Sequence, residues 1–245
     1  MVEAIPELAA RAKAHFGFSK DERRDFVIAL LLVGMILGFD DGQPTFDLIH
    51  WMVNLLACFL IAAFVIFINL GAQRLLALAK GYVLTHKMFV YGTLGGTIIG
   101  LASIGKLVLF APFELIFEQH EGMRIGRFRY GLNYYEMAVT AMMGPLANLL
   151  AAIIFKFIYL FIPSFFILNI VKLNVFMAVA TMLPIPKLAG SYVFMGNPFL
   201  FILVLSLSVV MGLLLFLLPP GWAIVMGGIL SLILAAVYFF KVDYK

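Results

Sequence analysis

Charged residues are scarce in this chain. Only 12% of its 245 residues are Asp, Glu, Lys or Arg, whereas an ordinary soluble domain has about 25%. This shortage of charge excludes a soluble globular protein. Cysteine is almost absent too, and because Cys58 stands alone, the chain forms no internal disulfide. The net charge of +4 is too small to indicate a nucleic-acid partner.

Apolar residues take up the space that charge leaves. They make up 64% of the chain, which includes 25 Phe, and the mean hydropathy is +1.09. Disordered chains have few aromatic residues and a high charge density, so disorder is excluded as well. The composition predicts a polytopic membrane protein whose first partner is the lipid bilayer.

The apolar runs predict an all-α fold. A membrane-spanning helix needs about 20 mostly apolar residues, which predicts about six spans in a single membrane-embedded domain, 1–245. The region 88–130 departs from this pattern, because its glycines, Pro112 and Glu114 argue against one lipid-facing helix. We expect a re-entrant element there that is partly a β-hairpin. The predicted spans are residues 26–39, 49–72, 137–162, 164–183, 198–218 and 221–240.

The basic residues predict the orientation. Of the 17 Lys and Arg residues, all except Lys156 and Lys172 fall on one face if both termini are cytoplasmic, as the positive-inside rule requires. Residues 1–25 then form a cytoplasmic surface segment, and Ser19 and Glu22 form a capping box. We expect Lys156 and Lys172 to extend along their helices towards the membrane surface. Ion or substrate transport through them is the alternative.

Polar residues stand on one face of the second predicted span. Asn69 and Gln73 are four residues apart and therefore share a helix face. An unpaired amide in hydrocarbon costs several kcal/mol, so these two side chains need partners in neighbouring helices.

The next two spans carry short motifs. Gly144-Pro145-x-x-Asn148 combines a close-packing glycine with a kinking proline. Pro184 and Pro186 interrupt the chain shortly before Gly190, and a break of this kind at membrane depth must be buried in protein or line a cavity.

In their order and spacing, these motifs resemble the site-2 protease family of intramembrane zinc metalloproteases. That family has His-Glu-x-x-His on the second span, Gly-Pro-x-x-Asn on the next, and Asn-x-x-Pro-x-x-x-Leu-Asp-Gly on the one after. Here the two histidine positions hold Asn69 and Gln73, the glutamate position holds Leu70, and the aspartate position holds Ala189. Thr181 stands in place of the asparagine. The resemblance therefore implies the protease fold without its zinc ligands.

Peptide hydrolysis by a zinc enzyme needs three metal ligands and a general base. Amides are poor zinc ligands, and neither Leu70 nor Ala189 supplies a ligand or a base. We therefore expect no bound zinc and no catalytic residue. The resemblance implies a pseudoprotease that binds a transmembrane or membrane-adjacent polypeptide as scaffold, regulator or chaperone, between the spans carrying Gln73 and Ala189. An active protease with a relocated metal site, and a transporter or channel, are the alternatives.

The segment before the third span predicts a partner-binding hairpin. The runs 113–118 and 123–130 are β-prone and flank a turn. An exposed strand edge can bind an extended peptide without a metal; a hairpin that only closes the cytoplasmic mouth of the protein is the alternative. His120-Glu-x-x-Arg124 begins like a zinc motif but lacks its second histidine, and we expect His15, His50 and His86 to be surface or interfacial. The charged residues of the hairpin are Glu114, Glu118, Arg124, Arg127 and Arg129.

Overall fold

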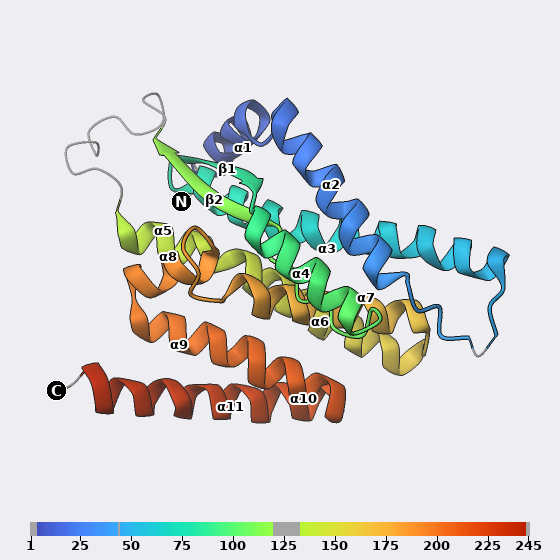
Figure 1. The fold of residues 1–245 in the computed structure, drawn as a ribbon. Coiled ribbons are helices and arrows are strands. Elements are labelled where there is room, and N and C mark those ends of the chain that lie inside the picture. Colours follow the sequence, from blue (N-terminus) through green and yellow to red (C-terminus); the bar gives the residue numbers. More distant parts are fainter. Residues whose placement is uncertain (1–3, 44, 120–132, 244–245) are drawn as a thin grey trace.

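The computed structural model describes residues 4–43, 45–119 and 133–243, and its chain is mostly helical (Figure 1). In chain order the elements are α1 (Ala4–His15), α2 (Lys20–Leu37), α3 (Leu48–Ala79), β1 (Tyr82–Met88), α4 (Val90–Ala102), β2 (Phe113–Gln119), α5 (Tyr134–Ala141), α6 (Met143–Phe161), α7 (Phe165–Thr181), α8 (Ala189–Gly196), α9 (Pro198–Ser206), the π-helical turn η3 (Leu207–Met211), α10 (Gly212–Leu217), α11 (Pro220–Tyr238) and the π-helical turn η4 (Phe239–Asp243).

The prediction of a helical membrane protein is confirmed in its broad form. Within the described residues, four helical stretches are long and apolar enough to cross a membrane, and they coincide with predicted spans. The other two predicted spans correspond to α2 and α7, and neither reaches the same criterion; α7 is apolar but has only 17 residues. The four stretches are Leu48–Ala79, Tyr134–Phe161, Pro198–Leu217 and Pro220–Val242.

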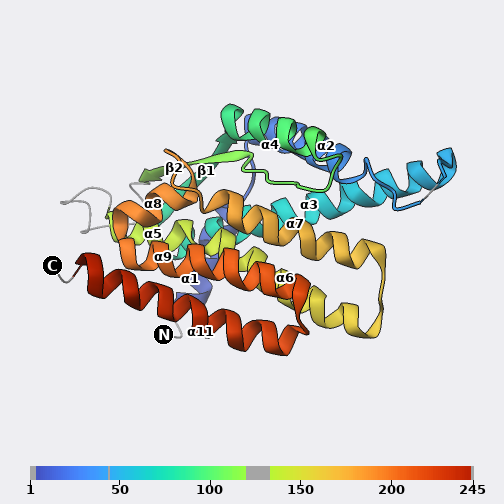
Figure 2. The same cartoon turned by 60° about the horizontal axis from the view of Figure 1, so that its bottom comes forward.

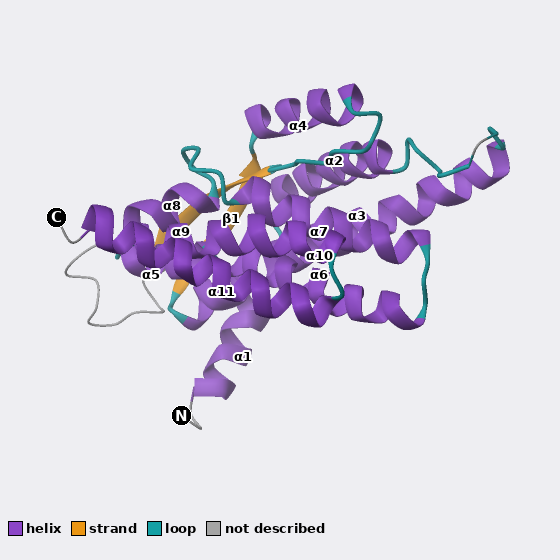
Figure 3. Ribbon diagram, turned by 90° about the horizontal axis from the view of Figure 1, so that it is seen from below, coloured by secondary structure: helices purple, strands orange, loops and turns teal. Residues whose placement is uncertain are grey.

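The helices form a layered bundle. Helix α6 packs against α7 and α3, and α11 packs against α9 on the opposite side of the bundle from α2 and α4 (Figure 2). Helix α4 lies outermost, against α2, while α1 projects from the other side (Figure 3). Region 88–118 is not one uninterrupted helix, as its glycines and Pro112 predict: α4 is followed by an extended return to β2.

The first strand of the predicted hairpin is present, and it pairs with an earlier segment of the chain. Strand β2 forms where the sequence predicts the first strand, but it pairs antiparallel with β1, with His86 opposite Leu115 and Lys87 opposite Glu114. The strand β1 was not predicted, although its β-branched and aromatic residues favour one. The predicted partner strand, 123–130, lies outside the described residues.

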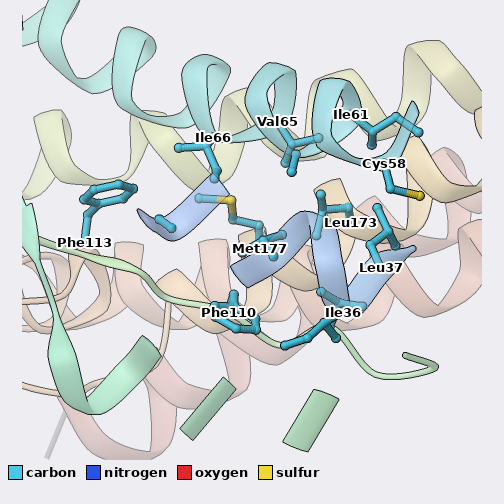
Figure 4. Packing of buried hydrophobic residues seen from close by; sticks show 14 of the residues in the cluster. Ile36, Leu37, Cys58, Ile61, Val65, Ile66, Phe110, Phe113, Leu173 and Met177 are labelled. Carbon is cyan, nitrogen blue, oxygen red and sulfur yellow. The ribbon is translucent and has the colours of Figure 1, made fainter. Parts of the chain in front are cut away.

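An extended part of the chain fills the space between α3 and α7. Val108, Phe110 and Phe113 are buried in one cluster with Ile66 of α3 and Met177 of α7, and Figure 4 shows Phe110 and Phe113 on different sides of Met177. Close packing of this kind adds many weak dispersion contacts. The cleft between the two helices is therefore occupied by the chain itself.

Candidate functional site

The residues at the family's catalytic positions surround a single small cavity, the inner cavity. It has a volume of about 10 Å³ for the centre of a water molecule, which is room for about one water. Three helices and the segment around β2 supply its lining. The lining residues are Asn69, Leu70, Gln73, Pro112, Phe113, Leu115, Met177, Thr181 and Ala189.

Gly144 and Pro145 explain how α6 approaches this cavity. A Cβ atom on Gly144 would lie 2.6 Å from Nε2 of Gln73 and 2.8 Å from Oδ1 of Asn69, so only glycine lets the helices come this close. Pro145 has no N–H to donate to the carbonyl of Ala141 four residues earlier. Nε2 of Gln73 donates to that carbonyl instead, at 2.8 Å. The motif thus creates the acceptor that pairs the buried amide.

His86 is the second partner of Gln73. Its side chain is buried, and its Nε2 lies 3.1 Å from Oε1 of Gln73. Because that oxygen can only accept, the proton of His86 lies on Nε2. Burial, and then the charge of Arg74, lower the pKa of His86 to about 3, so the ring is neutral. The prediction that His86 is a surface residue is therefore wrong.

A buried ion pair lies beside these residues. Arg74 of α3 donates to Glu22 of α2, and both side chains are almost fully buried. Arg74 also donates to the carbonyls of Phe16 and Gly17, at 2.9 and 3.0 Å. Glu22 in turn accepts from the main-chain N–H of His86 at 2.9 Å. We call the Glu22, Arg74, His86 and Gln73 side chains the polar joint, because they link α2, α3 and β1.

The polar joint was not predicted, and it corrects the boundary of the cytoplasmic surface segment. Residues 1–25 were expected to lie on the surface, but Glu22 and Asp25 are buried. The capping box is confirmed: the N–H of Ser19 donates to Oε2 of Glu22 at 2.8 Å, and the N–H of Glu22 donates to Oγ of Ser19 at 3.2 Å. Oδ2 of Asp25 accepts from the N–H of Met88 at 2.9 Å, so α2 carboxylates cover the outer edge of β1.

The proline break between α7 and α8 covers β2 in a similar way. The N–H of Leu115 donates to the carbonyl of Lys187 at 2.9 Å, and the hydroxyl of Tyr192 donates to the carbonyl of Leu115 at 2.8 Å. Lys187 has φ 73°, in the left-handed region that side chains other than glycine rarely adopt. A Cβ atom on Gly190 would lie 2.2 Å from the carbonyl oxygen of Met182, so Gly190 lets α8 start directly against the end of α7.

A larger cavity, the outer cavity, lies on the other face of β2. Phe113 and Leu115 line the inner cavity, while Glu114 lines the outer one, as the alternation of side chains along a strand requires. The outer cavity has a volume of about 550 Å³, within the range of about 300–1,000 Å³ found for ligand pockets. Its lining consists of Lys87, Met88, Phe89, Val90, Tyr91, Glu114, Ile185, Pro186 and Lys187.

The remaining predicted site residues have separate places. Oγ1 of Thr181 donates to the carbonyl of Met177 in its own helix, at 2.7 Å. Asn148 is fully buried, and neither of its amide atoms has a hydrogen-bond partner among the described residues. Pro184 and Pro186 are exposed, as is Glu118. The hairpin residues Arg124, Arg127 and Arg129, and the discarded motif at His120, lie outside the described residues.

The two lysines within the helices differ. Nζ of Lys172 donates to the carbonyl of Gly105 at 2.9 Å, so this side chain contacts the loop after α4. Nζ of Lys156 lies 5.3 Å from the ring centroid of Tyr159, one turn along the same helix.

In the part of the chain that the structure describes, no group of three or more His, Cys, Asp or Glu side chains is placed to hold a metal ion. Comparison with protein-family models, with curated proteins and with solved structures gives no match to this chain. The resemblance to the site-2 proteases rests on the motifs alone.

Proposed function

We propose that this chain is a membrane protein that binds an extended segment of a transmembrane or membrane-adjacent polypeptide without cleaving it, as scaffold, regulator or chaperone. The observation that carries the proposal is the contrast between the two cavities. The inner cavity has room for about one water, whereas the outer cavity measures about 550 Å³ and lies beside a β-strand.

The chemistry of the inner cavity supports binding over hydrolysis. A hydrolase needs a group that takes a proton from the attacking water. Leu70 and Ala189 offer none, and the amide of Gln73 is occupied by Ala141 and His86. His86 presents its Nε2 proton to Gln73, so that nitrogen is not available as a base.

The outer cavity suits an extended polypeptide. Its lining combines apolar side chains with Tyr91 and three charged residues, Lys87, Glu114 and Lys187, and a mostly apolar wall with a few polar groups is typical of binding pockets. A bound polypeptide can form a main-chain hydrogen bond to the N–H of Leu115 at the edge of β2 only if Lys187 moves away, because the Lys187 carbonyl already accepts from that N–H. The resemblance led us to expect a client between the spans of Gln73 and Ala189. That space is filled in this structure, and we place the client one layer further out.

Site-specific photo-crosslinking tests the proposal. A photoreactive residue at Ile185, which lines the outer cavity, should capture a polypeptide in native membranes. The matched control is Leu150, which is equally apolar and is 58% exposed on α6; it should capture lipid. The captured polypeptide, once identified and purified, should bind the purified chain, and Ile185→Arg should abolish that binding. Capture of lipid alone at Ile185, or of the same proteins at both positions, would overturn the proposal.

A further inference from the structure

A short exposed segment of the proline break lies against the outer edge of β2. Residues 183–187 are all exposed, and we call them the strap. The residues on either side of the strap are buried: Met182 belongs to the cluster that contains Leu115 of β2, and Leu188 belongs to a cluster with Phe89. The two ends of the strap are therefore anchored in the protein, whereas its own side chains lie at the surface.

Few bonds hold the strap against β2. Among the described residues, a single main-chain hydrogen bond joins the two, from the N–H of Leu115 to the carbonyl of Lys187 at 2.9 Å. Pro184 and Pro186 have no N–H to donate, so the strap cannot become a regular third strand of the sheet. Nζ of Lys187 also lies 3.1 Å from Oε2 of Glu114, but the lysine side chain is 62% exposed, and exposed ion pairs contribute little.

The position of the strap is also strained. Lys187 has φ 73°, a conformation in which the Cβ of any residue other than glycine lies too close to a neighbouring carbonyl oxygen. The same residue therefore provides the bond to β2 and carries the cost of making it. A local opening that releases Lys187 loses one main-chain hydrogen bond and an exposed ion pair, and it relieves the strain.

We propose that the strap is a movable segment of the chain that opens and closes the edge of β2. It turns away at Lys187 while Met182 and Leu188 stay buried, and this frees the N–H of Leu115. The bond from the Tyr192 hydroxyl to the Leu115 carbonyl comes from α8, beyond the anchor, and stays in place. In its closed position the strap competes with any polypeptide that pairs with β2; the identity of that competitor rests on the function proposed above, whereas the opening itself needs no client.

Hydrogen exchange at single-residue resolution measures the opening. The reporter is the N–H of Leu115, which bonds to the strap, and the control is the N–H of Phe89, which bonds to the carbonyl of Pro112 at 2.8 Å. After correction for intrinsic rates, Leu115 of the purified chain in detergent should exchange about tenfold faster than Phe89 or more, because local openings need less free energy than separation of the strands. Equal protection of the two would overturn the proposal.

Two substitutions at Lys187 provide the matched comparison. Both Lys187→Gly and Lys187→Ala lose the ion pair with Glu114, but only glycine relieves the strain at φ 73°. Leu115 should therefore exchange about fivefold more slowly in the glycine variant than in the alanine variant, and Phe89 should exchange equally in both. Equal exchange of Leu115 in the two variants would overturn the proposal, as would parallel changes at Leu115 and Phe89, which would mean that β1 and β2 separate as a unit.

Capture at Ile185 connects the strap to the proposed function. If the photoreactive residue there captures a polypeptide, the yield should be higher in Lys187→Ala than in Lys187→Gly, because the strap is open for more of the time. Equal yields would show that the polypeptide does not compete with the strap and would overturn that part of the proposal. Rapid exchange at Leu115 without any capture would support the strap and count against the proposed function.

Discussion

The two cavities lie on opposite faces of one strand, yet they are built in opposite ways. In the inner cavity, Gln73 and Thr181 bond to other atoms of the chain and the helices approach closely at Gly144. The outer cavity is some fifty times larger by the two volumes and is bordered by exposed lysines. The difference teaches that the residues around the inner cavity are packed and bonded within the protein, and that the larger space lies on the other face of β2.

The largest expected effect is the loss of the buried ion pair. Arg74→Ala leaves the Glu22 carboxylate buried without its cation, which costs about 3–5 kcal/mol of unfolding free energy. The measurement is chemical unfolding of the purified protein in detergent. As the control, Asp21→Asn breaks the pair between Asp21 and Arg24, whose side chains are 86% and 65% exposed, and should cost less than about 1 kcal/mol. Similar losses for both variants would contradict the contrast between buried and exposed sites.

Gly144→Ala tests the close packing of the inner cavity. The new Cβ would lie within 3 Å of the Asn69 and Gln73 side chains, and overpacking of this kind costs about 1–3 kcal/mol. Gly95→Ala is the control, because a Cβ there meets no atom within 4 Å, and alanine is the better helix former by up to about 1 kcal/mol. If both substitutions changed the unfolding free energy in the same direction, the inner helices would be loosely packed.

His86 predicts a pH dependence. Its pKa falls from 6.5 to about 3 in the folded protein, so on acidification the unfolded chain takes up the proton first. The stability contributed by neutral His86 is complete above about pH 6.5 and decreases by up to about 1.4 kcal/mol per pH unit towards pH 3.

Unfolding of the unmodified chain and of His86→Gln between pH 7 and pH 4 tests this dependence. The variant should show a shallower slope, and His50→Gln, on partly exposed His50, should keep the original slope. An unchanged slope in His86→Gln would show that protonation of His86 does not oppose folding.

The smallest effect concerns Lys187 at the outer cavity. Both Lys187→Gly and Lys187→Ala lose the ion pair with Glu114. The difference between their unfolding free energies therefore reports the cost of the backbone conformation at position 187. Glycine adopts φ 73° without strain, and alanine does not, so the glycine variant should be more stable by about 1 kcal/mol. Equal unfolding free energies would mean that the proline break relaxes to another conformation.

The features that depend on long apolar runs and on local motifs could be predicted from the sequence. The four most apolar spans and the cap at Ser19 and Glu22 depend on residues that are close in the chain. The motifs at Gly144 and Gly190 also indicated which segments lie close together. Gly144 packs against Asn69 and Gln73, and these two residues line the inner cavity together with Ala189.

The polar joint could not be predicted from the sequence, because the residues that bond to one another in it are far apart along the chain. His86 bonds to Gln73 across 13 positions and to Glu22 across 64, and no local pattern reports such pairings. One signal was missed: the β-branched and aromatic run at the start of β1 favours a strand, and that strand would have placed His86 against α3. The pairing of β2 with β1, an earlier segment of the chain, was not predicted for the same reason.

The two oxygens of Glu22 have consequences for biosynthesis. One completes the first turn of α2 by accepting from Ser19, while the other accepts from Arg74 and from the main chain of His86. During translation, the ribosome must add more than sixty residues after Glu22 before that second oxygen meets its last donor. A nascent chain that stops before β1 already contains Arg74 but lacks the N–H of His86, so the hydrogen bonds around Glu22 are complete only once β1 joins α2.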